Sequence, residues 1–107
     1  MNTYLCIDPG PETSGVVTLS SEGVTDVEKS IDNYLLVEQI VIWNADEMAI
    51  EMIASYGMAV GKDVFETCVW IGRFIQAWEL TGRAAHRVYR KDGRLRHRET
   101  VALENGE

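Results

Sequence analysis

The sequence predicts one α/β domain in which an antiparallel three-strand meander continues into a parallel sheet with packed helices. Three observations predict it. Short segments of strand-forming residues with tight turns fill the first 30 positions, an amphipathic helix spans residues 62–80, and that helix separates two further strand-like segments. A helix between successive strands implies parallel pairing by a right-handed crossover. With 107 residues, the chain has the length of a single hydrophobic core.

The meander is predicted from the first 30 residues. Residues 3–8 (TYLCID) favour a strand that ends at Pro9-Gly10, a strong turn signal. Residues 15–20 (GVVTLS) and 24–30 (VTDVEKS) predict the second and third strands. Because the turns between these segments are short, neighbouring strands are expected to pair antiparallel.

The remaining elements alternate between helix and strand. Asp32 and Asn33 are suited to cap a short helix over residues 34–43. A buried strand is predicted within residues 45–55, and a last strand at residues 85–90. The domain therefore extends over residues 1–92, followed by a divergent tail at residues 93–107.

The long helix is predicted from apolar residues at helical spacing. Gly82 suits its end. The residues at near-helical spacing are Val64, Phe65, Cys68, Val69, Gly72, Ile75 and Gln76, and the apolar face is widened by Ile71, Phe74 and Trp78.

Composition excludes several classes of protein. The chain is 46% apolar and 25% charged, which is typical of a globular domain rather than a disordered one. No apolar run approaches the roughly 20 residues that span a bilayer, and the N-terminus lacks the features of a secretory signal. Cys6 and Cys68 form no CxxC motif and lie in apolar segments, so we expect buried, reduced thiols. These features predict a cytoplasmic protein without membrane contact.

Charge is distributed unevenly along the chain. The formal net charge is −7, which by itself disfavours a nucleic-acid partner. However, residues 83–98 contain seven basic residues and one acidic residue, whereas residues 1–82 contain three basic and thirteen acidic residues. The basic segment is either a solvated tail or a surface for phosphates. The candidate phosphate contacts are Lys62, Arg87, Arg90, Lys91 and Arg94.

Two carboxylates are candidates for chemistry. Asp8 ends the first strand, and Glu51 lies between Ile50 and Met52 in the later apolar strand. Neighbouring strands lie roughly 4.8 Å apart, so acids on adjacent strands can share one cation, and Mg²⁺ prefers oxygen ligands. Alternatively, Asp8 is a turn residue before Pro-Gly, and Glu51 pairs with an arginine or faces outward from an edge strand.

Two segments resemble a known family. YLCIDPGPETSGVV and AIEMIASYGMAVGKDVFETCVWIGRF are similar to the RuvC-like Holliday-junction resolvases, particularly phage-encoded ones, of the RNase H-like superfamily. The resemblance implies a five-stranded mixed sheet with its first and fourth strands adjacent at the centre. It also implies that Asp8 and Glu51 are catalytic, metal-binding residues. The implied activity is Mg²⁺- or Mn²⁺-dependent hydrolysis of branched or structured DNA.

The sequence departs from the family after residue 92. The family carries further acidic ligands on a C-terminal helix, whereas GRLRHRETVALENGE contains no matching motif. We therefore expect a C-terminally truncated or frameshifted relative, and a homodimer that hides the apolar surface left by the missing helix.

Three functions follow from these expectations. The first is a metal-dependent nuclease acting on branched DNA. The second is a catalytically silent domain that binds nucleic acid or a protein. The third, a fragment of a phosphate-binding ATPase-like fold, rests on the opening loop alone.

Overall fold

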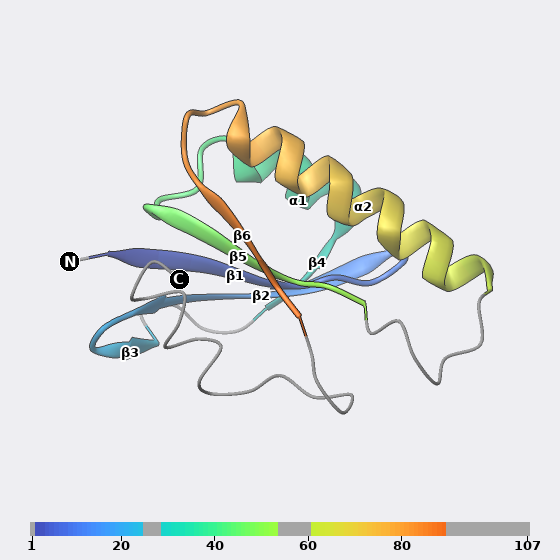
Figure 1. Ribbon diagram of the computed structural model, residues 1–107, viewed down its shortest axis with the longest axis horizontal. Helices are drawn as coiled ribbons and strands as arrows, with labels where there is room; N and C mark the ends of the chain where they lie inside the picture. The colour runs from blue at the N-terminus through green and yellow to red at the C-terminus, as the bar shows by residue number, and fades with distance from the viewer. Residues whose placement is uncertain (1, 25–28, 54–60, 90–107) are drawn as a thin grey trace.

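A computed structural model describes residues 2–24, 29–53 and 61–89. Within these residues the chain forms six strands and two helices (Figure 1). Their order is β1 (Thr3–Asp8), β2 (Thr13–Ser20), β3 (Gly23–Val24), β4 (Lys29–Asp32), α1 (Asn33–Ile40), β5 (Glu47–Glu51), α2 (Lys62–Glu79) and β6 (Ala85–Val88). The predicted α/β order is confirmed.

The strands form one mixed sheet with β1 in a central position. The strand order is β3-β2-β1-β5-β6, and β4 also pairs with β2. β1 is antiparallel to β2 but parallel to β5, and β5 is parallel to β6. The two strands that carry Asp8 and Glu51 are therefore direct neighbours, as the resemblance implied.

The predicted third strand at residues 24–30 is replaced by two short strands. β3 pairs Val24 with Leu19, and β4 pairs Lys29 with Val16. The two partners on β2, Leu19 and Val16, are three residues apart, whereas Val24 and Lys29 are five residues apart. β3 and β4 therefore do not pair with β2 in one regular register. The alternating sequence VTDVEKS predicts an extended conformation but contains no signal for this shift.

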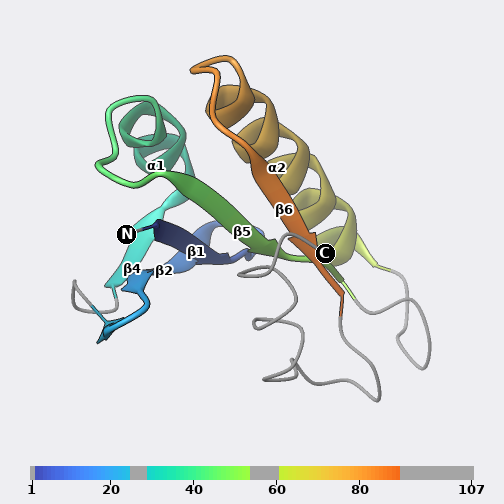
Figure 2. The ribbon, with the colours of Figure 1, turned by 60° about the vertical axis from the view of Figure 1, so that its left-hand side comes forward.

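Both helices lie on the same face of the sheet, and the core fills the space between (Figures 1 and 2). Alternate residues of the central strands point into it, because successive side chains of a strand project to opposite faces. The core consists of Leu5, Ile7, Val16, Met48 and Ile50 from the sheet, Leu36 and Ile40 from α1, and Trp70, Ile71, Phe74, Ile75 and Trp78 from α2. Each of the larger side chains contributes about 1.5–3 kcal/mol by its burial.

α1 begins at the predicted cap but ends before residue 43. The Asp32 carboxylate accepts hydrogen bonds from the backbone N–H groups of Tyr34 and Leu35, at 3.0 and 3.3 Å. At the other end, the Arg83 guanidinium donates to the carbonyl oxygens of Ile40 and Trp43, at 3.2 and 2.6 Å. Arg83, 40 residues beyond Trp43, thus donates to carbonyl oxygens that would accept hydrogen bonds from backbone N–H groups if the helix continued.

α2 matches its predicted range, and Ile71, Phe74, Ile75 and Trp78 of its predicted apolar face are buried, but other residues of that face are not. Phe65, Cys68 and Val69 are exposed, and the expectation that both cysteines are buried is wrong for Cys68. The helix has apolar side chains on two faces, and only one of them can pack on the sheet. The packed stripe contains Trp70, Ile71, Phe74, Ile75 and Trp78. Among the described helices, none is long and apolar enough to cross a membrane.

Candidate functional site

Asp8 and Glu51 are the last residues of the two parallel neighbours, β1 and β5. The ladder between these strands runs to the pair Ile7–Ile50, so the two acids occupy the next position on each strand. Ile7 and Ile50 point into the core, and alternation therefore turns Asp8 and Glu51 toward the opposite face. Both carboxylates lie on the face away from α1 and α2, at the carboxyl ends of their strands.

The two acids line one open cavity. Its volume is about 230 Å³. The carboxyl ends of parallel strands are a common position for ligands in α/β folds. The other lining residues are mostly small or apolar and come from four strands, namely Cys6, Ile7, Gly15, Val16, Val17, Ala49 and Val88.

The donor set fits a hard divalent cation. Asp8 is exposed and Glu51 is half-buried, so solvent reaches both carboxylates. Mg²⁺ is commonly held by one or two carboxylates and keeps several water molecules. Within the described residues, no group of three or more His, Cys, Asp or Glu side chains could hold a metal ion. Within the described part of the chain, the candidate site therefore consists of two carboxylates.

Cys6 contributes a neutral group to this cavity. Burial raises the pKa of the Cys6 thiol to about 11. Because only the thiolate is a strong nucleophile and metal ligand, the Cys6 side chain is a poor candidate for either role near neutral pH. The two carboxylates are therefore the candidates for chemistry among the residues that line the cavity.

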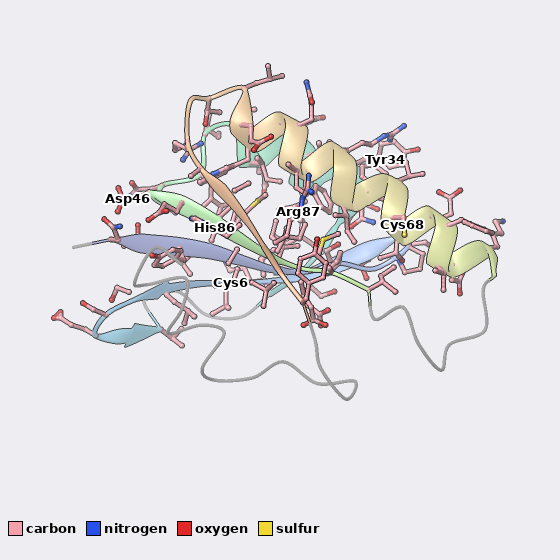
Figure 3. All side chains as sticks on the ribbon, in the orientation of Figure 1. Cys6, Tyr34, Asp46, Cys68, His86 and Arg87 are labelled. Atoms are coloured by element: carbon pink, nitrogen blue, oxygen red, sulfur yellow. The ribbon has the colours of Figure 1, made fainter. Side chains whose placement is uncertain are left out.

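The predicted phosphate contacts have different positions. Lys62 is exposed and is the first residue of α2, which begins at the end of the sheet where β1 and β5 finish (Figure 1). Arg87 is exposed on β6, opposite Ile50, and its side chain lies on the helix-bearing side of the sheet (Figure 3). Arg90, Lys91 and Arg94 lie outside the described residues, as does the predicted tail at 93–107.

A second polar pair, Glu47 and His86, lies toward the amino ends of β5 and β6. The Glu47 Oε1 atom lies 2.6 Å from His86 Nε2, and Glu47 Oε2 accepts a hydrogen bond from Asn2 at 2.8 Å. Glu47 projects to the same face as Glu51, four residues earlier on β5. It is thus a carboxylate on the same strand and face that lies outside the cavity lined by Asp8 and Glu51.

Three residues beside Asp8 have roles at the site that the sequence did not predict. Gly15 is the ladder partner of Asp8 on β2, and Ser14 and Asn33 hold the turn that follows Asp8. The sequence signal that could have indicated them is the run Pro9-Gly10-Pro11. Because the two prolines have no backbone N–H, this turn can form few backbone hydrogen bonds of its own, and side chains from other segments hold it instead.

Comparison with known proteins identifies the fold. No protein-family model matches the sequence, and no curated protein matches it. Among solved structures, RuvC of T. thermophilus in complex with a Holliday junction substrate superposes with a TM-score of 0.67 at 11% identity, covering 99% of this chain and 79% of that one. A second Thermus thermophilus RuvC structure gives 0.63 at 13% identity, covering 97% and 78%. The chain has the RNase H-like fold of RuvC, and the predicted fold class is confirmed.

Proposed function

We propose that this chain is a divalent-cation-dependent endonuclease that hydrolyses phosphodiester bonds in branched DNA. The observation that carries the proposal is the convergence of Asp8 and Glu51 on one cavity at the carboxyl ends of adjacent parallel strands. The fold supports it, because one of the similar RuvC structures holds a Holliday junction substrate.

In this proposal the two carboxylates bind and orient Mg²⁺ or Mn²⁺. When bound, such an ion supplies positive charge that stabilises the phosphoryl-transfer transition state. Lys62, at the same end of the sheet, would contact a backbone phosphate and orient the DNA strand. Arg87, Arg90, Lys91 and Arg94 would add backbone contacts, which carry affinity rather than sequence selectivity.

Cleavage of a labelled four-way DNA junction with Mg²⁺ or Mn²⁺ tests this function. We expect Asp8→Asn and Glu51→Gln each to abolish turnover while the protein stays folded. Glu47→Gln is the matched control, because Glu47 lies on the same strand and face as Glu51 but does not line the cavity. Cleavage that persists in both Asp8→Asn and Glu51→Gln would refute the assignment.

A second candidate function is a catalytically silent domain that binds branched nucleic acid. The observation that favours it is the two-carboxylate site, since the described residues offer no third acidic, His or Cys ligand beside Asp8 and Glu51. Junction binding that needs no divalent cation and yields no cleavage would support this alternative over the nuclease.

We further propose that the protein works as a homodimer, which suits a two-fold symmetric junction. The outward side of the helices exposes large apolar side chains, a pattern typical of interaction surfaces. Its members are Tyr34 and Leu35 on α1, and Phe65 and Val69 on α2. Light scattering at micromolar concentration should give twice the mass of the chain, and a monomer would contradict the proposal.

A further inference from the structure

The turn after Asp8 is held by a closed ring of three hydrogen bonds. The Gly10 N–H donates to Ser14 Oγ at 3.2 Å, and the Ser14 hydroxyl donates to Asn33 Oδ1 at 2.6 Å. The Asn33 side-chain amide then donates to the Gly10 carbonyl at 2.8 Å. Ser14 is 2% exposed and Asn33 is fully buried. Both backbone groups of Gly10 are thus fixed by side chains from β2 and α1.

The sequence of the turn explains why side chains hold it. Pro9 and Pro11 have no backbone N–H, so Gly10 supplies the single amide donor of the Pro9-Gly10-Pro11 segment. Position 10 also has no room for a side chain, because a Cβ there would lie 2.4 Å from the Thr13 carbonyl oxygen. The backbone at Gly10 is therefore packed closely against the backbone at Thr13.

The ring also connects the turn to the rest of the domain. Asn33 is the first residue of α1, and its backbone N–H donates to the Glu12 carbonyl at 2.9 Å. Since buried polar groups are costly when a partner is removed, deleting one member leaves the others unsatisfied. A change at Ser14 or Asn33 should therefore loosen the turn two residues beyond Asp8.

We propose that Ser14 and Asn33 are positioning residues for the Asp8 carboxylate in cation binding. The inference rests on the proposed function of the Asp8–Glu51 site. Asp8 is the last residue of β1, so its backbone is held by the ladder on one side and by this turn on the other. Mg²⁺ demands near-ideal ligand geometry, and metal ligands must be held within about 0.5 Å of it. The ring supplies that restraint.

Mn²⁺ affinity measured by electron paramagnetic resonance, without DNA, tests the proposal. We expect Ser14→Ala and Asn33→Ala each to weaken Mn²⁺ binding roughly tenfold or more while unfolding in urea stays cooperative. Thr18→Val is the matched control. Thr18 is also a buried hydroxyl residue on β2, and its Oγ1 accepts a hydrogen bond from Trp43 at 3.2 Å, far from the turn.

The outcomes separate the two proposals. Wild-type affinity in Ser14→Ala, or equal weakening in Thr18→Val, overturns the positioning role. If Asn33→Ala fails to fold, Ser14→Ala carries the test, because it deletes one oxygen atom. If the wild type cuts no junction but Ser14→Ala and Asn33→Ala bind Mn²⁺ more weakly than it does, the nuclease function is refuted. The positioning role of Ser14 and Asn33 is then still supported. If the wild type binds Mn²⁺ no better than Asp8→Asn, both proposals fail.

Discussion

Gly15 lies directly across from Asp8 in the β1–β2 ladder, and both residues line the same cavity. A Cβ at position 15 would lie 3.7 Å from the Asp8 Cβ, an ordinary contact distance. A longer side chain, however, would project along the face that carries the two carboxylates. Gly15 therefore leaves space for a ligand beside Asp8.

This relationship predicts opposite outcomes for two substitutions at one position. Gly15→Ala should retain cation binding, whereas Gly15→Leu should fill the cavity and lower junction cleavage by roughly 100-fold, as misplacement of reacting groups commonly does. Calorimetric titration with Mn²⁺ and single-turnover cleavage would measure both effects. Equal activity of the two variants would show that the cavity is not the site.

Arg83 predicts a stability effect that is independent of the site. Its guanidinium donates to backbone carbonyls that include those of Ile40, Trp43 and Ala45, and lies 3.6 Å above the Trp78 ring. Arg83→Met leaves these carbonyls without their charged donor, so we expect a loss of about 2 kcal/mol in the free energy of unfolding, measured with urea. Arg83→Lys should recover little, because lysine lacks the planar fork.

A matched control for this prediction is Arg87→Met. Arg87 is an exposed arginine on β6, and exposed substitutions usually change stability by less than about 0.5 kcal/mol. If Arg87→Met lowers the free energy of unfolding as much as Arg83→Met does, the loss of a positive charge, and not the loss of the carbonyl contacts, accounts for the effect.

Cys6 predicts a stability change at alkaline pH. Burial raises its pKa from 9.0 to about 11 in the folded protein. Below pH 9 the thiol is protonated in both the folded and unfolded states, and its favourable burial is fully retained. As the pH rises from 9 toward 11, the unfolded state releases the proton first, so this contribution is lost. The urea midpoint should therefore fall more steeply over this range in the wild type than in Cys6→Ala.

Cys68→Ala provides the comparison for the Cys6 prediction. Cys68 is exposed on α2, so Cys68→Ala removes a thiol without removing a buried side chain. Parallel curves for the wild type and Cys6→Ala would contradict the prediction.

Local patterns were sufficient for most of the fold. The run TYLCID and its following Pro-Gly predicted β1, and Asp32 predicted the start of α1, because these signals act over a few residues. The early end of α1 carries no local signal, and Arg83, which donates to the Ile40 carbonyl there, is 43 residues beyond Ile40. The exposed face of α2 was also missed. Phe65 and Trp70 belong to different apolar faces of this helix. Only the position of the sheet decides that the face with Trp70 is the one that packs.

The candidate site was predicted in part. The resemblance matched Asp8 and Glu51 to two strands, and the ladder confirms that these strands are neighbours. The roles of Gly15, Ser14 and Asn33 beside Asp8 were not predicted, because small and polar residues carry no periodic signal. Their roles arise from cross-strand pairing and from a buried hydrogen-bonded ring.

The positions of Lys62 and Arg87 predict different contributions to DNA binding. Lys62 begins α2 at the carboxylate end of the sheet, whereas Arg87 lies on the helix-bearing side of β6 (Figures 1 and 3). Each phosphate contact that is removed lowers the slope of log K against log salt by about 0.9. Lys62→Gln should therefore reduce the slope for junction binding by about one, and Arg87→Gln should reduce it less. Fluorescence anisotropy across a salt series, with Asp8→Asn protein to prevent cleavage, measures both slopes. A larger effect from Arg87→Gln would place the DNA along the edge of β6 instead of across the end of the sheet.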